Sequence, residues 1–194
     1  LEEVRQRFSY YPREVWLYLL ACGWARIGQE EHLMGRAGLV GDEVGSALIG
    51  ARLVRDIMRL CFLMERCYAP YPKWFGTAFK RLACGPELYP TLRKALSART
   101  WQTRQKHLIP AYEFVARKHN ALGLTKPLPE TTLGFFGRPF QVIALHGFVG
   151  ALLAEISDPA IAALPLIGSV DQWSDNTDLL ENNDLRAQIA GMYA

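Results

Sequence analysis

The sequence predicts an all-α protein, a helical bundle of about five to seven helices. Apolar residues recur at helical spacing through most of the chain, whereas no segment shows the strict alternation of a strand. The breaks between the periodic segments fall where proline and glycine gather. The 194 residues, half of them apolar, suffice for one domain with a hydrophobic core.

The first helix is expected over residues 12–32, with Pro12 in its first turn, where proline is tolerated. The glycines that follow, at 35, 38, 41 and 45, predict a tight corner between two helices. The second helix is expected from Asp42 to about Cys67, because acidic residues at its start suit the helix dipole.

The rest of the chain divides at prolines and glycines as well. The stretch YAPYPKWFG carries two prolines that end the second helix. The remaining predicted segments are helices over 74–82, 87–98 and 100–120, a loop over 123–138, a last long helix over 139–156, and an irregular tail from Asp158 with a short helix near its end.

Residues 1–7 are predicted to be a linker from a missing upstream domain, and residues 8–194 a single helical domain. The first residue is Leu rather than Met, and the opening stretch LEEVRQR is charged. Such a start is typical of a segment cut from a longer protein. Removal of a tag or of unstructured residues is the simpler alternative.

Composition disfavours several classes of protein. A net charge of +3 is too small to indicate nucleic-acid binding. The four cysteines form no Cys-x-x-Cys pair, and no histidine lies at zinc-ligand spacing from them, so reduced thiols of a cytoplasmic protein and no metal site are expected. There is no signal peptide, and the longest apolar runs are too short to span a bilayer, so no membrane contact is expected.

The second predicted helix is the most informative. Four of its residues fall within an arc of roughly 60° at helical spacing, and we call them the arginine ridge: Arg52, Arg55, Arg59 and Arg66. Like charges at this spacing repel unless something anionic faces them. In one interpretation, acidic side chains of neighbouring helices pair with the ridge or solvent covers it. In the other, the ridge faces a cleft that holds a phosphate or carboxylate ligand, which guanidinium groups bind well.

Carboxylates near this helix raise a second question. Glu65 lies on the opposite, apolar side, so it must find a partner. Two roles are possible for Glu65: it forms a structural salt bridge, or it is an acid or base with a shifted pKa. At the glycine corner, Arg36 is free to point outward, while Asp42 and Glu43 occupy a helix N-terminus where an anion would otherwise bind. The simpler interpretation is that the glycine corner is only structural. The alternative hypothesis is that it faces a substrate or a partner.

Two other stretches carry chemistry. YPKWFGTAFKRL sets Tyr71, Lys73 and Trp74 beside prolines, and such a loop either stacks on a sugar or base or wedges onto the core. The run GSVDQWSDNTD over residues 168–178 lacks the Asp-x-Asp spacing that holds two magnesium ions in nucleotidyl transfer. It either caps a helix or faces the arginine ridge.

Three stretches together resemble a known family: FSYYPREVWLYLLACGWARIGQEEHLMGRAGLVGDEVGS, RLVRDIMRLCFLMERCYAPYPKWFGTAFKRL and SVDQWSDNTDLL. They are similar to a bacterial domain family of unknown function, number 4037, found on the C-terminal side of nucleotidyltransferase-like heads. The resemblance covers most of residues 8–180 and implies a bundle that resembles the substrate-binding helical domain of nucleotidyltransferases, next to a kanamycin-nucleotidyltransferase-like catalytic domain. No catalytic base is transferred, because the aminoglycoside enzymes share no motif with these stretches.

The resemblance leads to a first hypothesis, in which the chain is the C-terminal substrate-binding domain of a nucleotidyltransferase and lacks the catalytic Asp-x-Asp head. Mg²⁺ and a nucleoside triphosphate belong to that N-terminal head, and this chain places a small-molecule or other acceptor without a cofactor of its own. The residues expected at the acceptor are Arg36, Arg52, Arg55, Arg59, Tyr71, Lys73 and Trp74, with the carboxylates Glu30, Glu43 and Glu65 nearby. Of these carboxylates, Glu43 and Glu65 are weak candidates for a catalytic base.

Two other hypotheses compete with it. In the second hypothesis, the bundle is a non-catalytic interaction or oligomerisation module. It buries an apolar face against a partner protein or against a second copy of the chain in a homodimer. The third is a stand-alone helical enzyme such as a bundle ribonuclease. The spacing of arginine and histidine disfavours it, because Arg104 and His107 are too close together and Arg99 and His107 are one residue too far apart.

Overall fold

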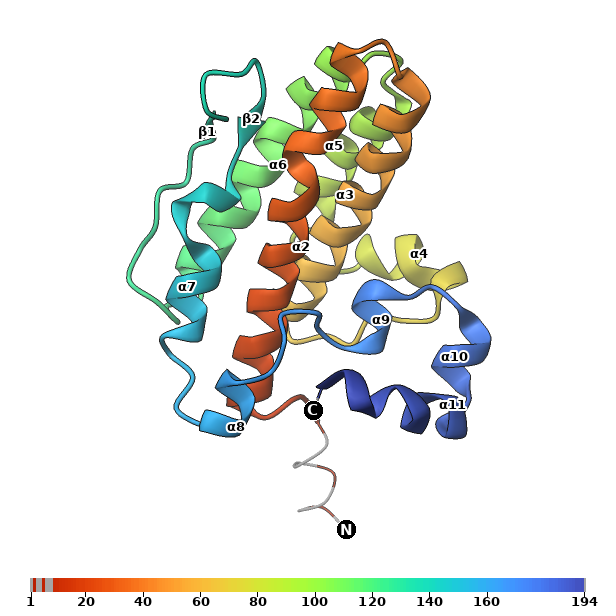
Figure 1. The fold of residues 1–194 in the computed structure, drawn as a ribbon, viewed down its shortest axis with the longest axis vertical. Helices are drawn as coiled ribbons and strands as arrows, with labels where there is room; N and C mark the ends of the chain where they lie inside the picture. Colours follow the sequence, from red (N-terminus) through yellow and green to blue (C-terminus); the bar gives the residue numbers. More distant parts are fainter. Residues whose placement is uncertain (1, 3–4, 6–8, 194) are drawn as a thin grey trace.

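The computed structural model describes residues 2, 5 and 9–193 and shows a bundle of long helices with short helices at one end (Figure 1). Ten α-helices, labelled α2 to α11, and one two-stranded sheet lie in these described residues. The all-α class is therefore confirmed, and the number of helices is higher than the five to seven predicted. The predicted linker over residues 1–7 lies mainly outside the described residues and stays a prediction.

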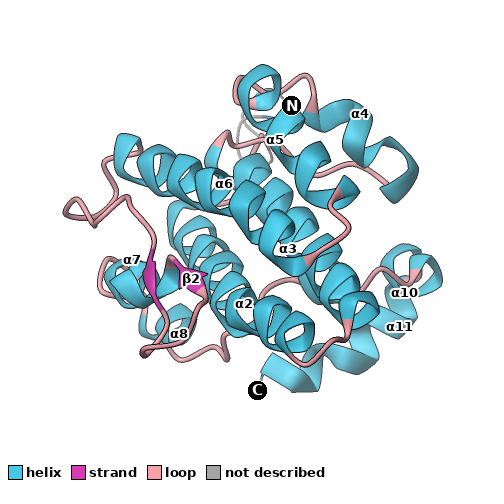
Figure 2. Cartoon of the chain, turned by 90° about the horizontal axis from the view of Figure 1, so that it is seen from above, coloured by secondary structure: helices cyan, strands magenta, loops and turns pink. Residues whose placement is uncertain are grey.

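Two antiparallel helices form the centre of the bundle, α2 (Arg13–Leu39) and α3 (Glu43–Met64). Pro12 lies immediately before α2, one residue earlier than expected. Helix α3 starts next to Asp42 as predicted, and Asp42 also caps it, since its carboxylate accepts a hydrogen bond of 2.7 Å from the backbone N–H of Gly45. Figure 2 shows α2 and α3 side by side, with α7 on one edge and α10 and α11 on the other.

The glycine stretch departs from the prediction. Helix α2 runs through Gly35 and Gly38 to Leu39, so the corner is confined to residues 40–42. A Cβ atom on Gly35 would lie 2.4 Å from the Phe140 ring, and one on Gly38 would lie 2.3 Å from the Trp101 side chain. These glycines are helical contact points for aromatic rings, and only Gly41, with φ +88°, makes the corner.

The segment after α3 follows the prediction in outline. A 3₁₀ turn, η1 (Pro72–Trp74), leads into α4 (Phe75–Phe79), which ends three residues before the predicted boundary at Leu82. Two longer helices, α5 (Gly85–Ser97) and α6 (Trp101–Ala121), then pack against each other and against α3. Their side chains complete one core, in which Leu60, Leu88 and Tyr112 are buried.

The predicted long helix over residues 139–156 is wrong. This region holds the hairpin of β1 (Leu133–Gly134) and β2 (Gln141–Val142), the 3₁₀ turn η2 (Ala144–His146) and the short helix α7 (Phe148–Leu153). The buried carboxylate of Glu31 on α2 accepts hydrogen bonds from the backbone N–H groups of Ile143, at 2.8 Å, and Ala144, at 3.2 Å. Contacts from α2 therefore replace helical hydrogen bonds here.

The C-terminal segment, residues 158–193, is more regular than the predicted irregular tail with one short helix. It contains α8 (Pro159–Ala162), α9 (Val170–Trp173), α10 (Thr177–Glu181), α11 (Asn183–Gln188) and the 3₁₀ turn η3 (Ile189–Tyr193). None of the side chains described in these five elements is buried. Among the helices of residues 9–193, none combines the length and the apolar character that a bilayer crossing requires.

Candidate functional site

The arginine ridge is paired with carboxylates. On α3, Arg52 Nε lies 2.7 Å from Glu30 Oε2 of α2. Arg59 Nη1 lies 2.9 Å from Asp171 Oδ2, and its Nη2 lies 3.4 Å from Asp175 Oδ1. These pairs match the interpretation in which acidic side chains of neighbouring helices cover the ridge.

The acidic run over residues 168–178 serves both roles left open for it. Ser169 caps α9, accepting a hydrogen bond from the backbone N–H of Gln172 while the Gln172 side chain accepts one from the Ser169 N–H. The same turn brings Asp171 and Asp175 over the ridge, where Asp175 also pairs with Arg55. The run therefore connects the C-terminal segment to α3.

Arg66 does not belong to the ridge in space. It follows the end of α3 with a left-handed φ of +54°. Its guanidinium carbon lies 5.3 Å from the Tyr10 ring centre and 5.0 Å from that of Trp16. The turn at the helix end rotates this side chain away, so the ridge consists of Arg52, Arg55 and Arg59.

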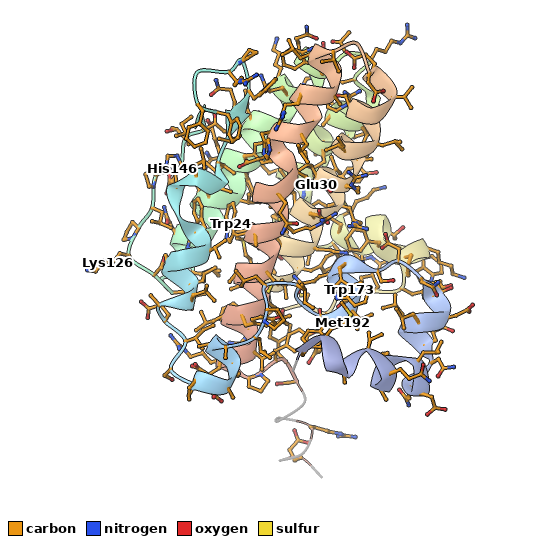
Figure 3. The ribbon with its side chains drawn as sticks, in the orientation of Figure 1. Trp24, Glu30, Lys126, His146, Trp173 and Met192 are labelled. Atoms are coloured by element: carbon orange, nitrogen blue, oxygen red, sulfur yellow. The ribbon has the colours of Figure 1, made fainter. Side chains whose placement is uncertain are left out.

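A buried charge network continues the ridge into the bundle. Glu30 and Asp56 are only 6% and 3% exposed, and Arg26 lies 2.9 Å from Glu30 and 3.5 Å from Asp56. Figure 3 shows Glu30 on α2 where that helix faces α3. Burial raises the pKa of the Asp56 carboxyl, although Arg55 and Arg26 oppose the rise. For Arg55, burial alone would lower the pKa, but Asp56 and Asp175 outweigh it and the pKa is raised.

A cleft of about 500 Å³ opens beside this network, between the loop after α3 and the C-terminal segment. Figure 1 shows α9 and α10 next to α4 at this side of the bundle. Charged and aromatic side chains dominate its walls: Tyr11, Arg59, Tyr68, Tyr71, Asp171, Glu181 and Arg186. Such a cleft offers aromatic faces for stacking, two guanidinium donors and two carboxylate acceptors.

The predicted acceptor residues separate into two groups. Arg59 and Tyr71 line the cleft. Lys73 and Trp74 follow Tyr71 in η1, where the Lys73 ammonium lies 5.2 Å from the Trp74 ring centre and Trp74 is 56% exposed. The loop YPKWFG thus leaves Tyr71 and Trp74 open to solvent, while Phe75 packs on the core.

Arg36 lies elsewhere. It is exposed in the last turn of α2, beside the start of α3. Arg59 comes sixteen residues after the first residue of α3, Glu43, which corresponds to roughly 24 Å along the helix. The structure therefore does not bring Arg36 to the cleft, and Arg52 and Arg55 reach it only through the ion-pair network.

The carboxylate candidates have structural partners. Glu43 accepts a 3.0 Å hydrogen bond from the Trp101 backbone N–H and pairs with Arg104. Glu65 lies 2.9 Å from Lys118 and accepts hydrogen bonds from the backbone N–H groups of residues 83 and 84. Burial would raise the pKa of Glu65, but Lys118 and these N–H groups lower it, which makes Glu65 a weak base. Of the two roles considered for Glu65, the geometry matches the salt bridge.

The sequence-based selection missed five of the seven charged and aromatic residues of the cleft. Asp171, Glu181 and Arg186 come from the C-terminal segment, and Tyr11 and Tyr68 come from the two ends of the α2–α3 hairpin. One signal in the sequence pointed to this wall of the cleft: the acidic run over residues 168–178 is complementary in charge to the arginine ridge. All four cysteines are free thiols, as predicted. In the described part of the chain, no group of three His, Cys, Asp or Glu side chains is arranged to hold a metal ion.

Fold and site together define an all-α domain with a charged, aromatic cleft at one end of a helical bundle. Residues 1–75 match the family described as Domain of unknown function (DUF4037). The match ends at the first residue of α4, just after the loop over residues 68–72 that forms one wall of the cleft. No curated protein and no solved structure matches the chain.

Proposed function

We propose that this chain is the helical, acceptor-binding part of a nucleotidyltransferase, and that the acceptor binds in the cleft between residues 68–72 and the C-terminal segment. The observation that carries the proposal is the composition of the cleft, in which Arg59 and Asp171 lie beside Tyr68 and Tyr71. The chain contains no Asp-x-Asp pair. The magnesium ions and the nucleoside triphosphate are therefore assigned to a head domain elsewhere in the same protein.

The cleft supports a polar acceptor with a ring. Tyrosine faces stack on a sugar or base ring and exclude water from one side of it. The carboxylate of Glu181 accepts hydrogen bonds from hydroxyl or amino groups, and Arg59 and Arg186 donate to acceptor oxygens. These groups bind and orient the acceptor. The base that removes its proton is not among the residues assigned here.

The test uses the full-length natural protein with Mg²⁺, nucleoside triphosphates labelled at the α-phosphate, and a metabolite extract as the source of acceptors. Transfer of label to a small molecule is the expected result. Arg59→Gln and Tyr71→Ala should each lower kcat/KM for the acceptor about tenfold, equivalent to about 1.4 kcal/mol, with the KM for the nucleotide unchanged. Arg93→Gln, on the exposed face of α5, is the matched control and should leave both constants unchanged. No labelled product with any of the four nucleotides would contradict the proposal.

An exposed apolar corner favours a second candidate function, self-association. Where α2 meets α3, Leu39, Val40, Val44 and Leu48 are 50%, 82%, 73% and 61% exposed. Apolar patches of this kind mark interaction surfaces, and a second copy of the chain is the partner we propose. Light scattering should show a dimer that Val44→Glu with Leu48→Glu converts to a monomer. A wild-type monomer at high concentration would rule this role out.

A further inference from the structure

Within the described part of the chain, both carboxylates that pair with Arg59, Asp171 and Asp175, belong to the C-terminal segment. The Arg59 side chain is only 12% exposed. On its other side the guanidinium faces the Phe75 ring, 5.5 Å from the ring centre. Displacing the C-terminal segment would therefore leave a largely buried cation without an anion, which is unfavourable unless another anion takes the place.

The carboxylates satisfy Arg59 incompletely. Its two terminal nitrogens are bonded, but its buried Nε has no hydrogen-bond partner among the residues that the structure describes. A guanidinium binds an oxyanion best through two parallel N–H groups, and the Nε–Nη edge is one such pair. A tetrahedral phosphate has enough oxygen atoms to use this edge and a terminal nitrogen at the same time, whereas the two separate carboxylates leave it open.

The charge balance defines the ligand further. The network that includes the ridge contains four arginines and four carboxylates, two of which belong to the C-terminal segment: Arg26, Arg52, Arg55, Arg59, Glu30, Asp56, Asp171 and Asp175. Removing Asp171 and Asp175 leaves two positive charges uncompensated. One dianionic phosphate monoester restores neutrality, while a single carboxylate restores half of it.

The C-terminal segment is held in a way that allows such an exchange. Besides the ion pairs, its anchors include hydrogen bonds, such as Gln172 Nε2 to the Leu19 carbonyl at 3.1 Å and Tyr18 Oη to the Pro165 carbonyl at 2.7 Å. Before α9, the partly buried side chains of Ile161, Leu164 and Leu166 also pack against the core. Asp171 and Asp175 are 42% and 55% exposed, so these carboxylates lose little when they return to water, and the cost of the exchange falls on the buried Arg59 until the phosphate replaces them. No apolar side chain described in α8–α11 has to leave a buried position.

We infer that the ligand of the cleft carries a phosphate monoester, and that its phosphate binds Arg59 through the Nε–Nη edge in exchange for the carboxylates of Asp171 and Asp175. This inference rests on the proposed function for the location of the acceptor, and it adds the chemical class of that acceptor. The ring of the acceptor then lies against Tyr68 and Tyr71, and the C-terminal segment shifts outward around it.

Phenyl phosphate is the probe, because it joins an aromatic ring to a dianionic phosphate. Isothermal titration calorimetry at pH 8 on the whole chain should show weak binding to the wild-type protein. Asp171→Asn with Asp175→Asn removes the competing carboxylates and should tighten binding at least about tenfold. Arg59→Gln should abolish binding, and Arg59→Lys, which keeps the charge but loses the Nε–Nη edge, should weaken it strongly.

The matched control is Asp178→Asn with Asp184→Asn, which makes the same charge change in the same segment at acids that pair with no ridge arginine. It should leave the affinity within about twofold of wild type. Equal tightening in both double variants would show a general charge effect and would overturn the inference. Failure of the wild-type protein and of all variants to bind phenyl phosphate would overturn it as well. Benzoate is the comparison ligand, because it joins an aromatic ring to a carboxylate. If benzoate bound as tightly as phenyl phosphate, the inference would also be overturned.

The two proposals fail separately. Phenyl phosphate binding that follows the expected pattern, with no nucleotidyl transfer by the full-length protein, would leave a phosphate site and remove the transferase assignment. Nucleotidyl transfer to an acceptor without a phosphate would keep the proposed function and remove this inference.

Discussion

The helical bundle and the C-terminal segment are held together by different interactions. In the bundle, side chains such as Ile57, Leu60 and Phe148 are fully buried, and burial of this kind supplies most of the stability of a domain. The C-terminal segment fully buries none of the side chains described in its helices. It is attached by ion pairs, by hydrogen bonds and by a few partly buried apolar side chains, such as Leu164 and Leu166. A rigid wall and a displaceable wall therefore meet at the cleft, which is an arrangement suited to ligand entry.

Removing a buried side chain should separate the two regions most clearly. Ile57→Ala takes three carbon atoms from a fully buried position on α3, the helix that packs against both α2 and α6. We expect a loss of about 2–5 kcal/mol in the free energy of unfolding, because a cavity remains. Leu185→Ala, at a site 38% exposed in α11, should change it by less than about 0.5 kcal/mol. Urea unfolding followed by circular dichroism measures both, and equal losses would remove the distinction between the regions.

A change of pH should act on the bundle through two buried groups of opposite effect. Burial raises the pKa of Glu31 from 4.5 to about 7, and burial lowers the pKa of His119 from 6.5 to about 4. As pH rises through these windows, the Glu31 contribution to stability is lost, because the folded state holds its proton more tightly. The His119 contribution is gained over the same range, because the unfolded state holds that proton more tightly.

The two contributions cancel in part between about pH 4.5 and 6.5, so variants reveal them. Relative to wild type, Glu31→Gln should become more stable as pH rises from 5 to 7, with a slope of up to about 1.4 kcal/mol per pH unit. His119→Gln should show the opposite slope over pH 4–6. Urea midpoints at each pH give the slopes, and parallel profiles for all three proteins would contradict the assignment of either group.

Salt should weaken the attachment of the C-terminal segment. Of the three effects, namely core substitution, pH and salt, this one involves the smallest free energy. Raising the NaCl concentration from about 0.05 to about 0.5 M shortens the range of charge interactions to a few ångströms. Exposed ion pairs contribute about 0.2–1 kcal/mol each, so backbone amides of α9 and α10 should exchange several-fold faster. Amides of α6 should keep their rates. Hydrogen exchange read by mass spectrometry distinguishes the two, and a salt-insensitive segment would mean that the ion pairs do not hold it.

The predicted helices were most accurate where a periodic apolar face coincides with a local signal for the helix end. Asp42 before α3 and the prolines at 70 and 72 after it are signals of this kind, and the structure confirms that helix to within a few residues. The prediction was wrong where a glycine or an apolar run acts through distant residues. Gly38 looks like a helix breaker in sequence but makes room for Trp101. The run after Pro139 pairs with β1 instead of forming a helix, and Glu31 binds the backbone N–H groups that follow this strand.

For the site, the sequence by itself determined the arginine ridge, since helical spacing places Arg52, Arg55 and Arg59 on one face, and it indicated that either an anion or solvent covers them. Only the tertiary structure decided which anion that is. The partners Asp171 and Asp175 lie 112 and 120 residues further along the chain from Arg59 and Arg55. No local rule relates such positions, because they meet only after the helices have packed and the C-terminal segment has folded back over α3. The separation of Arg36 from the cleft has the same physical reason: α2 and α3 are antiparallel, so residues near their shared corner lie far from the end of the bundle where the cleft forms.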